Sequence, residues 1–351
     1  MRIQPAASVA PWLAALALAA AGLLCAPSAA QTASAPAPPE PRQPVLETPW
    51  FRFYSNFDFN LFDAVLTSAT ARRDEQPDPF HGDCFTKLVQ EERSAWDSAV
   101  GYYSQTVAAT GDFSRERYIV RSRLAGDSPQ LDDDDRRDLA LSLLFLEAAS
   151  RAYRACGWPD QDATNRRWIA ELQGRLERHA DAIGRRLEEV YATKWRHLPI
   201  DVDVVGTAGW SGADTVAFSS APTHTQVSSR NPGYQGPNAL EMIFHEASHE
   251  LMTPNNGPTA QLLATAAAEA GVGVDRNLWH ALLFITAGDV TRSTLEKAGE
   301  GPYVPVAEEV LHRAWEPLYQ PLVTHWLPYV RGKAERRKAA HDLVVAIGTP
   351  K

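Results

Sequence analysis

Residues 236–252 read GPNALEMIFHEASHELM and contain two histidines, His245 and His249, four residues apart, with Glu246 directly after the first. On an α-helix, positions i and i+4 lie one turn apart on the same face, so both imidazoles can reach one metal ion. Glu246 then lies beside the pair, where its carboxylate can act on a water molecule. Because a proline follows the first glycine and residues 254–257 (PNNG) supply stop signals, we expect a helix of about 15 to 17 residues.

The apolar residues of this stretch favour a working site over a surface helix. They form one face beside a polar row that includes both histidines, which places that row at the wall of a cleft. The alternative is an amphipathic helix with two surface histidines. Apolar neighbours would then bury two imidazoles and a carboxylate with nothing to pair them, which is costly.

The segment 236–252 resembles the active-site helix of zincin metallopeptidases. The resemblance implies that His245 and His249 bind Zn²⁺, that Glu246 is the general base, and that the substrate is a peptide or protein. The metzincin pattern requires a further histidine where this chain has Asn255. A gluzincin-like or aspzincin-like arrangement, with its third ligand elsewhere, is therefore expected. The alternative is a zincin-like binding protein, with or without zinc, that hydrolyses nothing.

Three downstream residues are candidates for the third zinc ligand: His280, Glu269 and Asp289. His280 is preferred because it lies in an apolar helical segment, where a lone imidazole is costly unless something uses it. The segment 278–288 is also similar to one that follows the HExxH motif in uncharacterised secreted bacterial proteins. Asp289 can alternatively accept a hydrogen bond from a ligand histidine. For stabilising an oxyanion beside the metal, Tyr303 is the candidate.

The N-terminus has the pattern of a secretory signal peptide over residues 1–30, with an Ala- and Leu-rich run followed by Ser28-Ala29-Ala30. The run is short for a membrane anchor, and lipidation at Cys25 is a further alternative. Residues 31–46 are rich in Ala and Pro and predict an extended linker in which little packs. We expect a secreted or periplasmic protein with no membrane span in its mature chain.

The expected export predicts how the cysteines pair, and the net charge indicates which partners are excluded. Without Cys25, an even pair remains, Cys84 and Cys156, and in an oxidising compartment it predicts a disulfide, with two buried thiols as the alternative. The formal charge of −9 and the lack of a basic cluster argue against a nucleic-acid partner. The oligomeric state is left open.

The fold class expected is α+β, mainly α. Residues 47–197 predict a helical N-terminal part, in which four aspartates at 132–135 precede an apolar run and favour a helix start there. Residues 198–351 predict a zincin-like catalytic part with strands at 200–205, 215–218 and 223–228 ahead of the HExxH helix. The resemblance implies that residues 223–229 form an edge strand that pairs with an extended peptide, with His224 as a candidate for the cleft wall.

Overall fold

A five-stranded mixed sheet lies at the centre of the part of the chain that the structure describes. The structure is a computed structural model that describes residues 42–350 except 112–113, 128, 210, 217–222 and 253–256. The strand order is β1-β2-β3-β5-β4. The three inner strands run parallel, and β1 and β4 pair antiparallel at the two edges. The strands are β1 (Leu46–Glu47), β2 (Phe51–Tyr54), β3 (Ile200–Val205), β4 (Ala213–Val216) and β5 (His224–Ser228).

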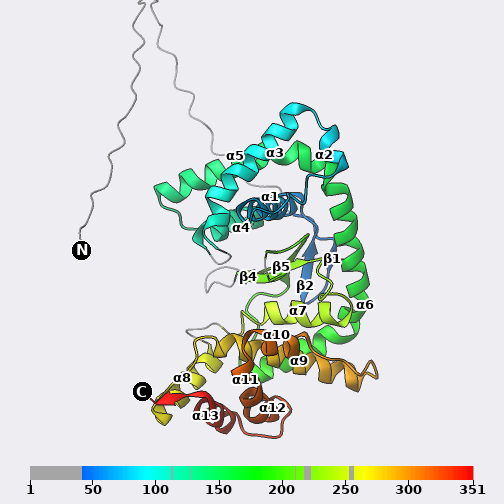
Figure 1. Ribbon diagram of the computed structural model, residues 1–351. Coiled ribbons are helices and arrows are strands. Elements are labelled where there is room, and N and C mark those ends of the chain that lie inside the picture. Colours follow the sequence, from blue (N-terminus) through cyan, green and yellow to red (C-terminus); the bar gives the residue numbers. More distant parts are fainter. Residues whose placement is uncertain are drawn as a thin grey trace, which may run out of the picture. The chain divides into compact units, whose positions relative to one another are not determined.

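Alternation along β3 gives the sheet two different faces. Val202 and Val204 are fully buried in the main core together with Phe244 of α7 (Pro237–Ala247). The opposite face packs on α1 (Phe57–Arg73), where Phe59 contacts Val205. Figure 1 shows the sheet between these two helices.

Helices make up most of the remaining chain. The helices before β3 are α2 (Asp83–Lys87), α3 (Gln90–Gln105), a 3-10 turn (Val107–Ala109), α4 (Arg115–Ala125), α5 (Asp133–Cys156) and α6 (Trp158–Tyr191). Those after α7 are α8 (Pro258–Ala270), α9 (Leu278–Lys297), α10 (Val306–Ala314), α11 (Glu316–Pro321), a π-helical turn (Leu322–Trp326), α12 (Leu327–Val330) and α13 (Arg336–Ile347). A two-stranded sheet joins β6 (Val272–Gly273) to β7 (Thr349–Pro350). The expected class, α+β and mainly α, is confirmed.

The long helix α6 joins the N-terminal helices to the helices around the HExxH motif. Its 34 residues extend about 50 Å at the usual rise, and it contacts α1 and α5 as well as α7 and α9. The preceding helix, α5, begins with a capping box between Asp132 and Asp135, which confirms the helix start expected there. None of the helices in the described part of the chain is long and apolar enough to cross a membrane.

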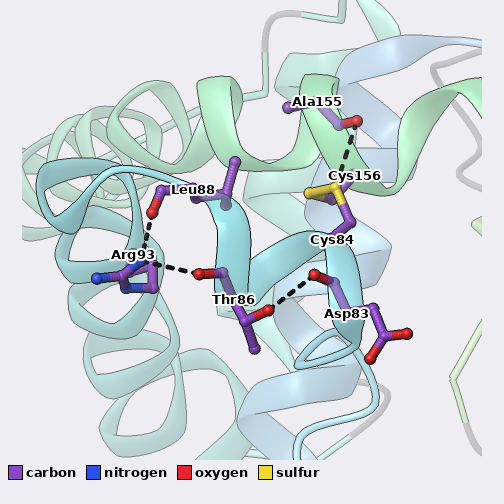
Figure 2. Close-up of a disulfide and its surroundings, with 7 residues drawn as sticks. All are labelled: Asp83, Cys84, Thr86, Leu88, Arg93, Ala155 and Cys156. Carbon is purple, nitrogen blue, oxygen red and sulfur yellow. Dashed lines mark hydrogen bonds between the residues drawn. A yellow bond between two sulfur atoms is a disulfide. The ribbon is translucent and has the colours of Figure 1, made fainter.

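The Cys84–Cys156 disulfide predicted from the sequence is present. It ties α2 to the last residue of α5, across 72 residues of sequence, and Figure 2 shows it beside the carbonyl of Ala155. Short polar contacts fix the same corner, since Thr86 donates to the carbonyl of Asp83 and Arg93 donates to the carbonyls of Thr86 and Leu88.

The structure differs from three expectations about local structure. The segment 223–229 does not form the edge of the sheet, because β5 lies between β3 and β4, and β4 is the edge strand. The sheet also recruits β1 and β2 from before the first helix, where no strand was expected. The last residues of the expected linker pack: Arg42 binds the fully buried Asp203, and Leu46 lies in β1. The expected signal peptide, residues 1–30, and residues 31–41 lie outside the described residues.

The HExxH helix is also shorter than expected, because α7 ends at Ala247. The chain continues through tighter turns in which the N–H of His249 donates to the carbonyl of Glu246, at 3.2 Å. The hydroxyl of Ser248 donates to the Phe244 carbonyl at 2.6 Å, a side-chain bond that competes with the regular helix pattern. His249 therefore lies two residues past the helix end.

Candidate metal centre

Two antiparallel helices bring three histidines together. His245 contacts Phe284 of α9, and His249, four residues later, contacts His280, four residues earlier on α9. The ring centroids of the three histidines are 5.1 to 5.4 Å apart. One ligand nitrogen from each lies within 4.8 Å of the others. A zinc ion with Zn–N bonds of about 2.0 to 2.1 Å needs nitrogens roughly 3.4 Å apart, which small ring rotations can reach.

Three ring nitrogens of this cluster are buried without hydrogen-bond partners among the described residues. Both ring nitrogens of His245, which is 1% exposed, and Nε2 of His280 have no hydrogen-bond partner among the described residues. Buried polar atoms without partners are costly, and a shared metal ion removes that cost. Three imidazoles are also a ligand set that zinc takes in catalytic sites, with a fourth position left open. The residues present therefore fit a metal ion.

Burial keeps the three imidazoles in the form that binds metal. It lowers the pKa of His249 to about 3 and that of His280 to about 4, and it lowers the pKa of His245 well below its usual range. Neighbouring imidazoles add to the lowering at His245 and His249. A metal ligand must be the neutral imidazole, so the site is ready for a cation at neutral pH.

Aromatic rings hold the imidazoles in place. Phe284 stacks on His245 with the centroids 3.6 Å apart. Trp279 stacks on the neighbouring His280 at 4.9 Å, and its edge-to-face contact with His249 is 5.6 Å. Trp315, from the turn between α10 and α11, adds a ring 5.2 Å from that of His280. The apolar shell limits access of water to the cluster.

Glu246 lies beside the histidines, as its position in the motif predicts. Its carboxylate oxygens are 3.9 Å from Nε2 of His245 and 3.8 Å from Nε2 of His249, too far for hydrogen bonds. The hydroxyl of Thr215 in β4 lies 2.7 Å from Oε2 of Glu246. Burial raises the pKa of Glu246 to about 8; the Thr215 hydrogen bond opposes this rise and the charge of Asp214 adds to it.

Tyr303 is engaged elsewhere, so the structure does not support its expected role beside the metal. Its hydroxyl donates to the carboxylate of Glu241 at 2.6 Å, and Glu241 lies on α7 one turn before His245. Among the described residues, no hydrogen bond or ring contact joins Tyr303 to the histidine cluster. The same carboxylate accepts the N–H groups of Val306 and Ala307 at the start of α10. Tyr303 therefore helps to fix α10 against α7.

The two alternative third ligands also have other roles. Glu269 is exposed at the end of α8, with its nearest basic partner, Arg337, at 3.9 Å. Asp289 is 4% exposed and pairs with Arg292 and with Arg331, whose Nη2 lies 2.8 Å away. Neither belongs to the group of side chains that could hold a metal ion, and His280 is the third member of that group.

His224 lies on the other face of the sheet from the histidine cluster. It stacks on Phe59 of α1 with the centroids 5.1 Å apart, and Nε2 contacts the carboxylate of Asp203. Arg42 binds the same carboxylate, and this network lowers the pKa of Asp203 although burial acts in the opposite direction. His224 is thus buried in an ionic network and does not line a cleft.

Sequence reasoning missed Thr215, Trp279 and Trp315. Thr215 falls in an expected strand, but only the sheet order shows that this strand passes Glu246. Trp279 precedes His280 directly, so an aromatic next to a candidate ligand was the available signal. Comparison with protein-family models, curated proteins and solved structures finds no match.

Proposed function

We propose that this chain is an exported zinc metallopeptidase. The observation that carries the proposal is the convergence of His245, His249 and His280, with the buried Glu246 beside them. Zinc is favoured over softer or harder metals because all three ligands are imidazoles. Bound Zn²⁺ would supply Lewis acidity for a carbonyl group.

The residues of the chain supply the other parts of a hydrolytic site. Glu246 lies beside the three imidazoles, where its carboxylate can take a proton from water. Among the described residues, the edge strand β4 has a strand neighbour on one side only, so its other side can pair with an extended peptide. This pairing, like the zincin resemblance of the motif, supports a peptide or protein as substrate.

Export is supported by the signal-like N-terminal sequence and by the Cys84–Cys156 disulfide, since disulfides persist in oxidising compartments. Secreted and periplasmic locations both meet this condition.

The substitution Glu246→Gln tests the proposal. It should abolish hydrolysis of a peptide library, while zinc stays near one equivalent per chain by metal analysis. Glu269→Gln is the matched control, because it changes an exposed glutamate outside the cluster and should leave both activity and zinc unchanged. Hydrolysis that persists in Glu246→Gln would contradict the role of the base. A wild-type protein that binds zinc and cleaves no peptide would contradict the peptidase and favour a binding protein.

A further inference from the structure

The edge strand β4 contacts the carboxylate of Glu246 directly. Thr215 stands opposite Thr225 in the β4–β5 ladder, and its Oγ1 lies 2.7 Å from Oε2 of Glu246. The same oxygen is 3.0 Å from the Glu246 carbonyl and 3.1 Å from the Thr225 hydroxyl. A hydroxyl carries one proton and can also accept hydrogen bonds. When Thr225 donates to Thr215, the Thr215 proton is left for Glu246.

Thr215 is the single hydrogen-bond donor that the described residues offer to this carboxylate. The imidazoles of His245 and His249 are 3.8 Å or more from its oxygens. Hydrogen bonds to a carboxylate are stronger than those between neutral groups, so this contact fixes the rotation of the side chain. Without it, Glu246 would keep its burial but lose its orientation.

The strand itself is held from its other face. Asp214, the neighbour of Thr215, points the opposite way and forms an ion pair with Arg121 of α4. Both side chains are mostly buried, with 7% of Arg121 and 18% of Asp214 exposed. An edge strand has hydrogen bonds to one neighbour only, so this ion pair adds a second attachment. The N-terminal helical layer therefore fixes the strand that contacts Glu246.

We propose that Thr215 is a positioning residue that orients the Glu246 carboxylate toward the histidine cluster, on a strand fixed by Arg121 and Asp214. This inference rests on the proposed function, because the orientation matters for a general base. A positioning role predicts a loss in the chemical step with little change in substrate binding, and it predicts rescue by a side chain that restores the hydroxyl.

Thr215→Val removes the hydroxyl and keeps the shape of the side chain. We expect kcat to fall at least about 10-fold, within the contribution of a general base, while KM and zinc content stay within about twofold. Thr215→Ser should recover most of kcat. The matched control is Thr291→Val, which removes a fully buried hydroxyl that has no hydrogen-bond partner among the described residues and should leave kcat unchanged. Equal losses in Thr215→Val and Thr215→Ser would overturn the proposal.

A second measurement does not depend on activity. In the metal-free protein, the shifts in Tm caused by Thr215→Val and Glu246→Ala should not add, because each removes the same hydrogen bond. The double variant should therefore lose less than the sum of the two. Additive shifts would overturn the positioning contact even if the enzyme is active. If the Tm shifts are non-additive but the wild-type protein cleaves no peptide, the Thr215–Glu246 contact is supported and the proposed peptidase function is refuted.

Discussion

The buried carboxyl of Glu241 should make the stability of the protein depend on pH with a defined sign. Glu241 has no exposed surface and accepts hydrogen bonds from the Tyr303 hydroxyl and from the N–H groups of Val306 and Ala307. Burial raises its pKa from 4.5 to about 7, against the opposing effect of these three bonds. The folded protein therefore holds this proton more tightly than the unfolded chain.

The sign follows from the raised pKa. The stabilising effect is complete below the unfolded pKa of about 4.5 and is lost as the pH rises through about 7. The rise of about 2.5 units corresponds to about 3 kcal/mol, at 1.36 kcal/mol per unit. Glu241→Gln removes the titration, so the free energy of unfolding of the wild type should fall relative to this variant by up to about 3 kcal/mol between pH 4.5 and 8.

Urea unfolding of both proteins across this pH range measures the difference. The metal is removed first, because metal binding also depends on pH and stabilises the folded state. Glu335→Gln is an informative control: this exposed carboxylate accepts two N–H groups at the start of α13, which lower its pKa. Relative to Glu335→Gln, the wild type should instead lose stability as the pH falls into the acid range. The reasoning is refuted if the free energy of unfolding of the wild type, measured relative to that of Glu241→Gln, stays constant or rises as the pH increases.

Four further substitutions test other parts of the structure. His280→Ala should lose most of the zinc by metal analysis with its circular dichroism unchanged, and retained zinc would remove His280 from the site; Glu269→Ala should keep its zinc. Cys84→Ser breaks a disulfide that spans 72 residues and should lower the free energy of unfolding by about 4 kcal/mol in the chain-entropy model, with an unchanged urea midpoint as the contrary result. Arg42→Ala leaves the buried Asp203 with His224 as its partner and should lower the free energy of unfolding by about 3 kcal/mol. A decrease under about 0.5 kcal/mol would mean that the ion pair contributes little to stability.

The sequence predicts the metal cluster better than its surroundings, for physical reasons. The HExxH spacing is local, so one helical turn brings His245 and His249 together. His280 was identifiable because a lone imidazole in an apolar helix needs a partner. The hydrogen bond of Tyr303 to Glu241 could not be predicted, because the two residues are 62 apart in sequence and only the packing of α10 on α7 brings them together.

The sheet was only partly predictable. Strand β3 follows a clear β-branched alternation and was expected at residues 200–205. Strand β2 reads FRFY, four residues in a stretch dense in aromatics within the part of the chain that was expected to be helical. The order of β4 and β5 depends on long-range pairing, which no local pattern encodes. Arg42 likewise lies in a Pro-rich stretch, and its anchoring depends on a buried aspartate 161 residues away.

The parallel pairing of β2 with β3 has a consequence for how the chain acquires its structure. Arg52 and Asp201, partners in this ladder, are 149 residues apart in sequence. Closing so large a loop is entropically costly and slows folding, so β2 can pair with β1 early but cannot pair with β3 until the whole helical segment has been synthesised. In a fragment that begins at residue 198, the side of β3 that pairs with β2 would be an unpaired sheet edge, and such edges promote aggregation. The segment 198–351 is therefore not expected to fold as an autonomous unit.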